Sequence, residues 1–179
     1  MIFQAPRIET DRLLLREFRV DDLDSLAAMW AKEEVIRFIG GTQLSREDVW
    51  RRCLAACAQW PLTGFGYWIA ELKDSGEIAG QLGFADFKRE MQPSIEGEPE
   101  LGYVFDPSVH GRGLAVEACI AVLEWGDRIL APASYPAIID SENVSSIRLA
   151  EKLGFIRQPD AIYHDAPHAL YRRPGKSAS

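Results

Sequence analysis

The sequence has few features of a membrane, secreted or disulfide-linked protein. No apolar run approaches the ~18 residues of a membrane-spanning helix. The N-terminus, MIFQAPRIETDR, does not have the basic and then apolar segments of a secretory signal. The 3 cysteines show neither disulfide-framework nor zinc-site spacing. These absences predict a soluble, cytoplasmic protein with no membrane partner and no metal.

Positive charge is also scarce. Lysine and arginine total 20 against 27 aspartates and glutamates, a formal net charge of −7. A chain without an overall positive field attracts nucleic-acid phosphates poorly, so we expect no nucleic-acid partner. Any anionic ligand must therefore be held by a local arrangement of donors.

What remains is the composition of an ordinary globular domain. The 179 residues are 47% hydrophobic and 26% charged, and a chain of this length can bury a core without a metal or disulfide. We predict one domain over residues 1–173. Residues 174–179, Pro-Gly-Lys-Ser-Ala-Ser, are small and polar and are expected to form a flexible tail.

The first half of the chain predicts a strand, two helices and three strands. The first strand covers residues 12–18, and Asp21 then serves as N-cap of a helix, with Val20 as a hydrophobic staple residue. Ser45 begins a second helix with a capping-box pattern. Alternating apolar residues predict the three strands at 67–72, 77–87 and 100–105.

The second half alternates helices with strands. A nearly all-apolar helix is predicted over residues 113–131, and a second helix over 143–153 has Asn143 as N-cap and Gly154 at its end. The chain thus belongs to the α+β class, with a central mixed, mostly antiparallel sheet of six to seven strands and helices on both faces. The remaining strands are expected at 137–139, 155–157 and 169–172.

The most informative segment runs from Glu100 to Ala115. A strand passes through a short loop into the long helix, and Gly111 and Gly113 stand at the joint. Backbone amides at a helix start lack partners inside the helix, and the helix dipole adds positive charge there. Glycines let a phosphate approach these amides. The pattern predicts an anion site, although glycines at such joints also serve packing alone.

Two common phosphate motifs do not fit this segment. The Walker A loop requires Gly-Lys-Ser/Thr, whereas Leu114 and Ala115 follow Gly113. The dinucleotide fingerprint requires a small third residue, and Val116 stands there instead.

The segment His110-Gly111-Arg112-Gly113-Leu114-Ala115 resembles the acetyl-CoA motif Gln/Arg-x-x-Gly-x-Gly/Ala of the GNAT superfamily of N-acetyltransferases. Gly113 and Ala115 are in register, and His110 stands where Gln or Arg is usual. Four other segments are similar to the branch that acetylates ribosomal-protein N-termini: Thr10-Asp-Arg-Leu-Leu-Leu-Arg16, Glu100-Leu-Gly-Tyr103, Glu117-Ala118, and Asn143-x-x-Ser146 with Glu151-Lys-Leu-Gly-Phe155.

The resemblance implies a GNAT-like fold with a sheet that splays in its middle. The strand ending Tyr103-Val104-Phe105 would part from a parallel neighbour at 137–139, and the pantetheine arm of acetyl-CoA would pair with the exposed backbone. Amides of Arg112, Gly113, Leu114 and Ala115, in the loop that also contains His110 and Gly111, would hold the pyrophosphate. Asn143 and Ser146 would lie along the pantetheine and the thioester, although Asn143 can equally be a plain helix cap.

The implied activity is direct transfer of acetyl from acetyl-CoA to a primary amine, either a protein N-terminus or a small molecule. An α-amine, with a pKa of ~7.7–8.0, needs less base assistance than a lysine at ~10.4. Glu100 is the first candidate base, and its alternative role is to pair with an arginine. Ser146 and Tyr163 are further catalytic candidates, Tyr163 in a loop with His164 and Asp165. Tyr171 is either a proton donor or a core aromatic.

Other features leave alternatives open. Cys53 and Cys57 suit packing better than a covalent acetyl-cysteine route. The aromatic segment 60–68 either lines an acceptor groove or fills the core, and loops 42–45 and 88–99 are expected to shape its entrance. A catalytically silent CoA-binding sensor or interaction module is the second hypothesis, motivated by His110. The acceptor is not identified, and the chain is expected to be a monomer or homodimer.

Overall fold

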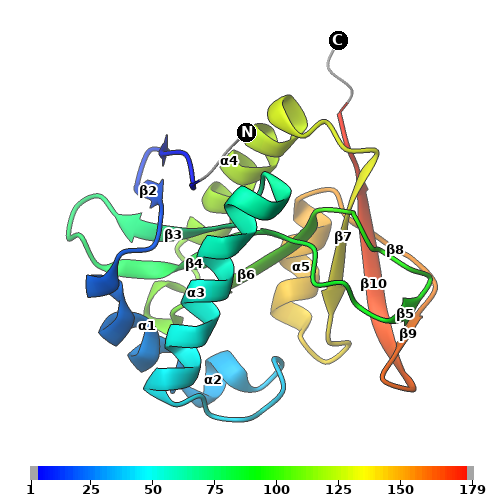
Figure 1. The fold of residues 1–179 in the computed structure, drawn as a ribbon, viewed down its shortest axis with the longest axis horizontal. Coiled ribbons are helices and arrows are strands. Elements are labelled where there is room, and N and C mark those ends of the chain that lie inside the picture. Colours follow the sequence, from blue (N-terminus) through cyan, green and yellow to red (C-terminus); the bar gives the residue numbers. More distant parts are fainter. Residues whose placement is uncertain (1–3, 177–179) are drawn as a thin grey trace.

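The computed structural model describes residues 4–176 and has helices on both faces of a divided sheet (Figure 1). The first half contains β1 Ile8–Glu9, β2 Leu13–Arg16, a 3-10 turn Val20–Asp22, α1 Leu23–Trp30, α2 Glu33–Ile36, α3 Arg46–Thr63, β3 Tyr67–Leu72, β4 Ile78–Ala85 and β5 Met91–Gln92. The second half contains β6 Glu100–Phe105, a 3-10 turn Pro107–Val109, α4 Leu114–Ile129, β7 Ser134–Ile139, α5 Val144–Lys152, β8 Ile156–Arg157, β9 Ala161–Tyr163 and β10 Ala166–Pro174.

The strands form two sheets of five. One has the order β1-β2-β3-β4-β6, and the other has the order β5-β9-β10-β7 with β8 paired to β10. The α+β class and the GNAT-like fold are confirmed. Between residues 4 and 176 every backbone pairing is antiparallel, and β6 and β7, the two strands predicted to part, have no ladder between them. Short strands that periodicity could not detect raise the strand number above the six to seven expected.

The two sheets meet at β6 and β7. Each is the last strand of its sheet, and β7 lies beside β6 without a backbone ladder between them. Pro136, in the middle of β7, lacks a backbone donor, which is tolerated at the edge of a sheet. Two strand edges therefore face each other in the middle of the molecule.

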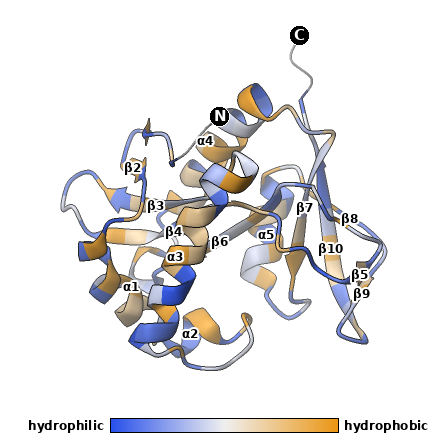
Figure 2. Ribbon diagram, in the orientation of Figure 1, coloured by the Kyte–Doolittle hydropathy of each residue, from blue (hydrophilic) through white to orange (hydrophobic). Residues whose placement is uncertain are grey.

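The core has a layer on each side of the first sheet. Trp60, Trp68 and Trp125 pack edge to face under α4, with ring centroids 4.6–5.7 Å apart. On the opposite face, Val49 of α3 and Ile69 of β3 belong to a cluster formed with α1 and α2. Figure 2 shows apolar and hydrophilic residues alternating along α3 and α4, as expected for helices that cover a sheet.

Helix starts were partly predictable. Ser45 and Asp48 form the predicted capping box of α3, and Asn143 caps α5 by accepting from the Ser146 amide. The start of α1 differs. Asp22, not Asp21, accepts a hydrogen bond from the Arg19 amide at 2.7 Å, and Val20 is 68% exposed and no staple residue. Asp22 is selected because its carboxylate also binds buried Arg16.

Residues 174–176, which the sequence assigned to a flexible tail, make backbone contacts with the rest of the domain. β10 extends to Pro174, the Gly175 amide donates to the Ala133 carbonyl, and the Lys176 amide donates to Asp127. Asp127 is buried on α4 and pairs with Arg173 at 2.8 Å. These contacts hold residues 174–176 against the domain, and residues 177–179 of the predicted tail lie outside the described part of the chain.

Candidate functional site

The loop between β6 and α4 contains two glycines with positive φ values. Gly111 and Gly113 have φ values of 72° and 76°, in the left-handed region that favours glycine. A β-carbon on Gly111 would meet nothing within 4 Å, and one on Gly113 would meet only the guanidinium of Arg12 at 3.6 Å. The space beside the loop is open, so packing does not explain these glycines.

Four consecutive backbone amides in this loop are available to a ligand. Within residues 4–176, the N–H groups of Arg112, Gly113, Leu114 and Ala115 have no backbone acceptor. Glu117 is the first residue whose amide closes a helical bond, to the Gly113 carbonyl. Exposed donors at the start of a 16-residue helix suit a phosphate group.

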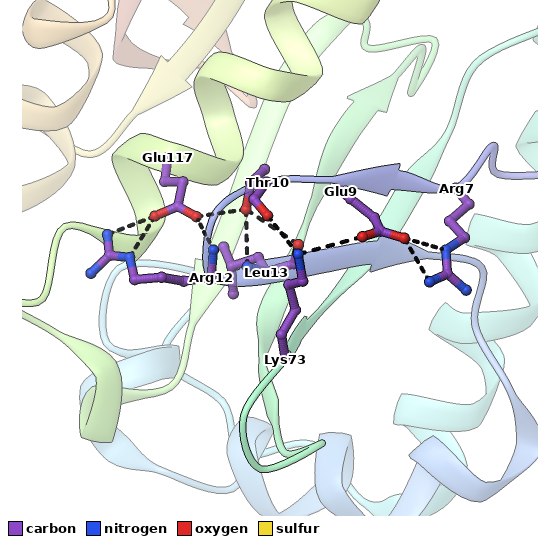
Figure 3. Close-up of polar contacts among 7 residues, drawn as sticks. All are labelled: Arg7, Glu9, Thr10, Arg12, Leu13, Lys73 and Glu117. Carbon is purple, nitrogen blue, oxygen red and sulfur yellow. Dashed lines mark hydrogen bonds and ion pairs between the residues drawn. The ribbon is translucent and has the colours of Figure 1, made fainter.

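The loop is fastened to the N-terminal strands by Arg12 and Glu117 (Figure 3). Arg12 donates through Nε to Glu117 at 2.7 Å and through Nη1 to the Arg112 carbonyl at 2.8 Å. Thr10 Oγ1 and the Arg12 amide also donate to Glu117 Oε1. Two of the segments noticed in the sequence, 105 residues apart, thus form one unit beside the anion loop. The sequence alone indicated no functional role for Arg12 or Glu117.

The ionisation of Glu117 supports this arrangement. Burial alone would raise the pKa of its carboxyl, but hydrogen bonds from Thr10 and from the amide and side chain of Arg12 outweigh it and lower the pKa. Glu117 is therefore charged at neutral pH and neutralises one guanidinium, while Arg112 stays exposed.

His110 does not point freely into the loop. Its Nε2 lies 3.2 Å from the Phe105 carbonyl oxygen, at the end of β6. The side chain therefore joins the loop to the strand. This contact gives a structural reason for histidine at the position where glutamine or arginine is usual in the resembled motif.

Tyr103 links β6 to α5 across the line where the two sheets part. Its hydroxyl donates to the Ser146 carbonyl at 3.0 Å, and burial raises its pKa, so it stays protonated. The Ser146 hydroxyl has no partner among the described residues, and its amide is capped by Asn143. Ser146, Tyr103 and Asn143 are thus gathered at one place, on the α4 side of β6.

Glu100 lies on the other face of β6, where an arginine holds it. The carboxylate is buried, and Arg89 donates to its two oxygens through Nε at 2.8 Å and Nη2 at 3.0 Å. The guanidinium of Arg89 also lies 5.3 Å from the ring centre of Tyr163. Arg89 therefore contacts two predicted catalytic residues, Glu100 and Tyr163. The third, Ser146, lies on the opposite face of β6.

The sequence suggested that Tyr163 lies in a loop, but the structure places it in a strand. It ends β9, and His164 and Asp165 form the tight turn to β10 with φ values of 50° and 58°. Tyr171 is buried in the core beneath the guanidinium of Arg157, which supports the packing alternative for it.

A cavity of about 240 Å³ lies between α3 and the first sheet, on the Glu100 face. From the aromatic segment 60–68, Trp60 and Tyr67 line this cavity, while Trp68 is fully buried in the core. Its walls come from the N-terminal segment, the end of β2, the helix α3 and the strands β3 and β4. They are formed by Gln4, Ala5, Glu17, Phe18, Cys53, Ala56, Cys57, Trp60, Tyr67, Ile69 and Gln81.

The cysteines are poorly suited to nucleophilic chemistry. Burial raises the pKa of Cys53 to about 12 and also raises that of Cys57, where the Glu17 carboxylate adds to the effect. Cys119 is buried in α4, and burial raises its pKa too. All three are thiols at neutral pH, which disfavours an acetyl-cysteine route.

Between residues 4 and 176, no group of three or more histidine, cysteine or acidic side chains could hold a metal ion. None of the helices in the same range is both long and apolar enough to cross a membrane.

Comparisons with known proteins agree with this geometry. The Acetyltransferase (GNAT) domain family matches residues 12–156. YkkB of Bacillus subtilis (strain 168) is 36% identical over 170 residues, covering 93% of this chain and 95% of YkkB. A GnaT-family acetyltransferase of Bordetella pertussis has a TM-score of 0.81 with 31% identity, covering 94% of this chain and 99% of that one.

The ribosomal branch is represented among structures with the same fold. RimL, a ribosomal L7/L12 alpha-N-protein acetyltransferase solved with coenzyme A, has a TM-score of 0.77 over 97% of this chain and 100% of its own. Its identity of 14% indicates a shared fold alone.

Proposed function

Because the chain belongs to the GNAT acetyltransferase family, we propose that it moves the acetyl group of acetyl-CoA to a primary amine by direct attack in a ternary complex. The observation that carries the proposal is the set of four unpartnered amides, from Arg112 to Ala115, on an open loop at the start of α4.

These amides are assigned to the pyrophosphate, together with Gly111 and the positive charge of Arg112. The facing edges of β6 and β7 are assigned to the pantetheine arm, because an unpaired strand edge offers alternating donors and acceptors. Tyr103, Val104 and Phe105 supply the β6 edge. Asn143 and Ser146, at the start of α5, are assigned to the thioester end.

Acetyl-CoA supplies an activated acyl group: a carbon–nitrogen bond forms, the carbon–sulfur bond breaks, the amine loses a proton, and the departing thiolate takes one up. The protein has to orient the amine, stabilise developing charge and move protons. The unpartnered Ser146 hydroxyl is the proposed donor at the sulfur end.

Glu100 is the proposed proton acceptor on the amine side. Arg89 donates to both of its oxygens, and each oxygen keeps a second lone pair that can take up the proton. An amine that is already partly neutral near pH 7 needs little base assistance.

The test is calorimetry with acetyl-CoA, followed by a thiol-release assay with peptides, small amines and amino acids as acceptors. Micromolar binding with release that depends on the acceptor is expected. Absence of binding at millimolar acetyl-CoA would overturn the proposal. Tight binding without release for any acceptor would favour the silent CoA-binding module.

A further inference from the structure

The cavity under α3 has a distinctive distribution of charge. Glu17 is its one charged wall residue, and neither lysine nor arginine lines it. The Glu17 side chain is exposed and has no hydrogen-bond or ion-pair partner among residues 4–176. Cys53 and Cys57 beside it stay uncharged. The Glu17 end of the cavity therefore favours a cation.

The inner end of the cavity reaches β6 through Tyr67. Tyr67, Gly83 and Gly102 lie in one row across β3, β4 and β6. A β-carbon on Gly102 would overlap the Tyr67 hydroxyl, so the tyrosine side chain lies across the row and places its hydroxyl on β6. Gln81, another wall residue, is paired in register with Val104 of β6.

Two polar groups at this inner end lack partners. Neither the Tyr67 hydroxyl nor the Gln81 amide makes a side-chain hydrogen bond in the described part of the chain. Burial, and next the Glu100 carboxylate, raises the pKa of Tyr67, so its hydroxyl is protonated and can both donate and accept. A substrate amine placed here would be beside the strand whose free edge faces β7.

The end of the cavity at Glu17 and the inner end at Tyr67 are separated by apolar walls. Glu17 directly follows β2, and β2 is three strands from β6 in the sheet order. At ~4.8 Å per strand this is ~14 Å. Phe18, Trp60 and Ile69 lie along the cavity between the ends, and aromatic faces also tolerate ammonium groups. The volume, about 240 Å³, is below the ~300–1,000 Å³ typical of sites for drug-sized ligands.

We propose that this cavity binds a linear aliphatic diamine or polyamine as the acetyl acceptor. One ammonium group pairs with Glu17, the methylene chain lies along the apolar walls, and the amine to be acetylated lies at Tyr67 and Gln81 beside β6. This inference rests on the proposed function and specifies its substrate class. A linear chain with an ammonium group at one end and the reacting amine at the other matches a small cavity with apolar walls and one carboxylate far from the reacting strand.

The test compares 1,8-diaminooctane with octylamine, which differ by one amino group. In the thiol-release assay, the parent protein is expected to have a kcat/KM about tenfold higher for the diamine. Glu17→Gln should remove most of that preference by raising KM for the diamine while leaving octylamine and acetyl-CoA affinity unchanged. Glu124→Gln, an exposed carboxylate on α4, changes net charge equally and should keep the preference.

A second pair of variants tests the cavity itself. Ala56→Leu fills it from α3 and should lower kcat/KM for both amines at least tenfold, whereas Ala55→Leu, exposed on the same helix, should leave both unchanged. Thermal unfolding of the four variants identifies any loss of folding.

The inference is overturned if Glu17→Gln affects both amines equally or neither, or if Ala56→Leu leaves diamine turnover intact. It is also overturned if peptides with free N-termini are better acceptors than the diamine in the parent protein. In each case acetyl-CoA binding and turnover of another amine would show that the proposed acetyltransfer stands. Loss of acetyl-CoA binding altogether would instead reject the proposed function.

Discussion

The two halves of the candidate site are built in different ways. The half assigned to acetyl-CoA is a continuous stretch of backbone, from Arg112 to Ala115, whose donors are amides. The half assigned to the acceptor is a cavity lined by side chains from the N-terminal segment, β2, α3, β3 and β4. Backbone donors depend on a local turn that many sequences can make. The side-chain cavity depends on residues particular to this chain, so we expect the acceptor half to determine specificity.

The largest effect should come from adding a charged side chain to the backbone half. Gly113→Asp places a carboxylate beside the loop amides and a β-carbon at φ 76°, and should weaken acetyl-CoA binding by about 100-fold, or about 2.7 kcal/mol. Calorimetry measures the affinity. Gly76→Asp is the control, because Gly76 has φ 74° and open space in a distant turn. Both variants bear similar strain, ~1–2 kcal/mol, so equal binding by Gly113→Asp and the parent would contradict the loop assignment.

The next prediction concerns the boundary between the halves. Glu100→Gln should lower kcat/KM for the amine about 30-fold, which is below the ~100-fold or more typical of general bases because a partly neutral amine needs less help. Acetyl-CoA affinity should be unchanged, since Glu100 lies on the acceptor face of β6. Glu98→Gln is the matched control, because Glu98 is also held by an arginine, Arg172, at 2.8 Å. If both variants turn over like the parent, Glu100 serves only to pair with Arg89.

A smaller effect is expected from the side chain that fastens the backbone half. Arg12→Gln removes the donor to the Arg112 carbonyl and should weaken acetyl-CoA binding about tenfold, with amine KM unchanged. Arg7→Gln breaks an exposed pair with Glu9, seen in the same view, and should have no effect (Figure 3). An equal response of the two variants would mean that Arg12 does not position the loop.

The smallest effect is a pH dependence of stability. The folded state lowers the pKa of Glu117, so its contribution is present above the unfolded value of ~4.3 and is lost as the pH falls through the lower folded value. Glu117→Gln should therefore cost about 1–2 kcal/mol of unfolding free energy at pH 7, and the difference should shrink below pH ~4. Denaturant unfolding at several pH values measures it. A constant difference would show that ionisation of Glu117 is irrelevant, and Glu124→Gln is the exposed control.

Much of the backbone half could be predicted because its signal is local. The strand at 100–105, the glycine joint and the Asn143 cap follow from neighbouring residues, and the structure has them where expected. The link between Arg12 and Glu117 was missed because the two residues are 105 positions apart and neither pattern indicates the other.

The acceptor half was largely hidden for the same reason. Tyr67 belonged to an aromatic segment in which each ring could also fill the core. Only the register of β3, β4 and β6 shows that Tyr67 and Trp68 have different surroundings. Glu17 directly follows the apolar strand β2, and no neighbouring residue in the sequence indicated a role for it. The arginine partner of Glu100 was anticipated as an alternative, but its identity as Arg89 depends on how loop 88–99 folds back.

The facing edges of β6 and β7 have a consequence for the protein in a living cell. If a ligand arm bridges them, the ligand completes a sheet that the polypeptide leaves divided, and at 100 times its dissociation constant it adds ~2.7 kcal/mol to the free energy of unfolding. Resistance to proteolysis, and with it the abundance of the enzyme, would then rise and fall with the metabolic supply of its own donor.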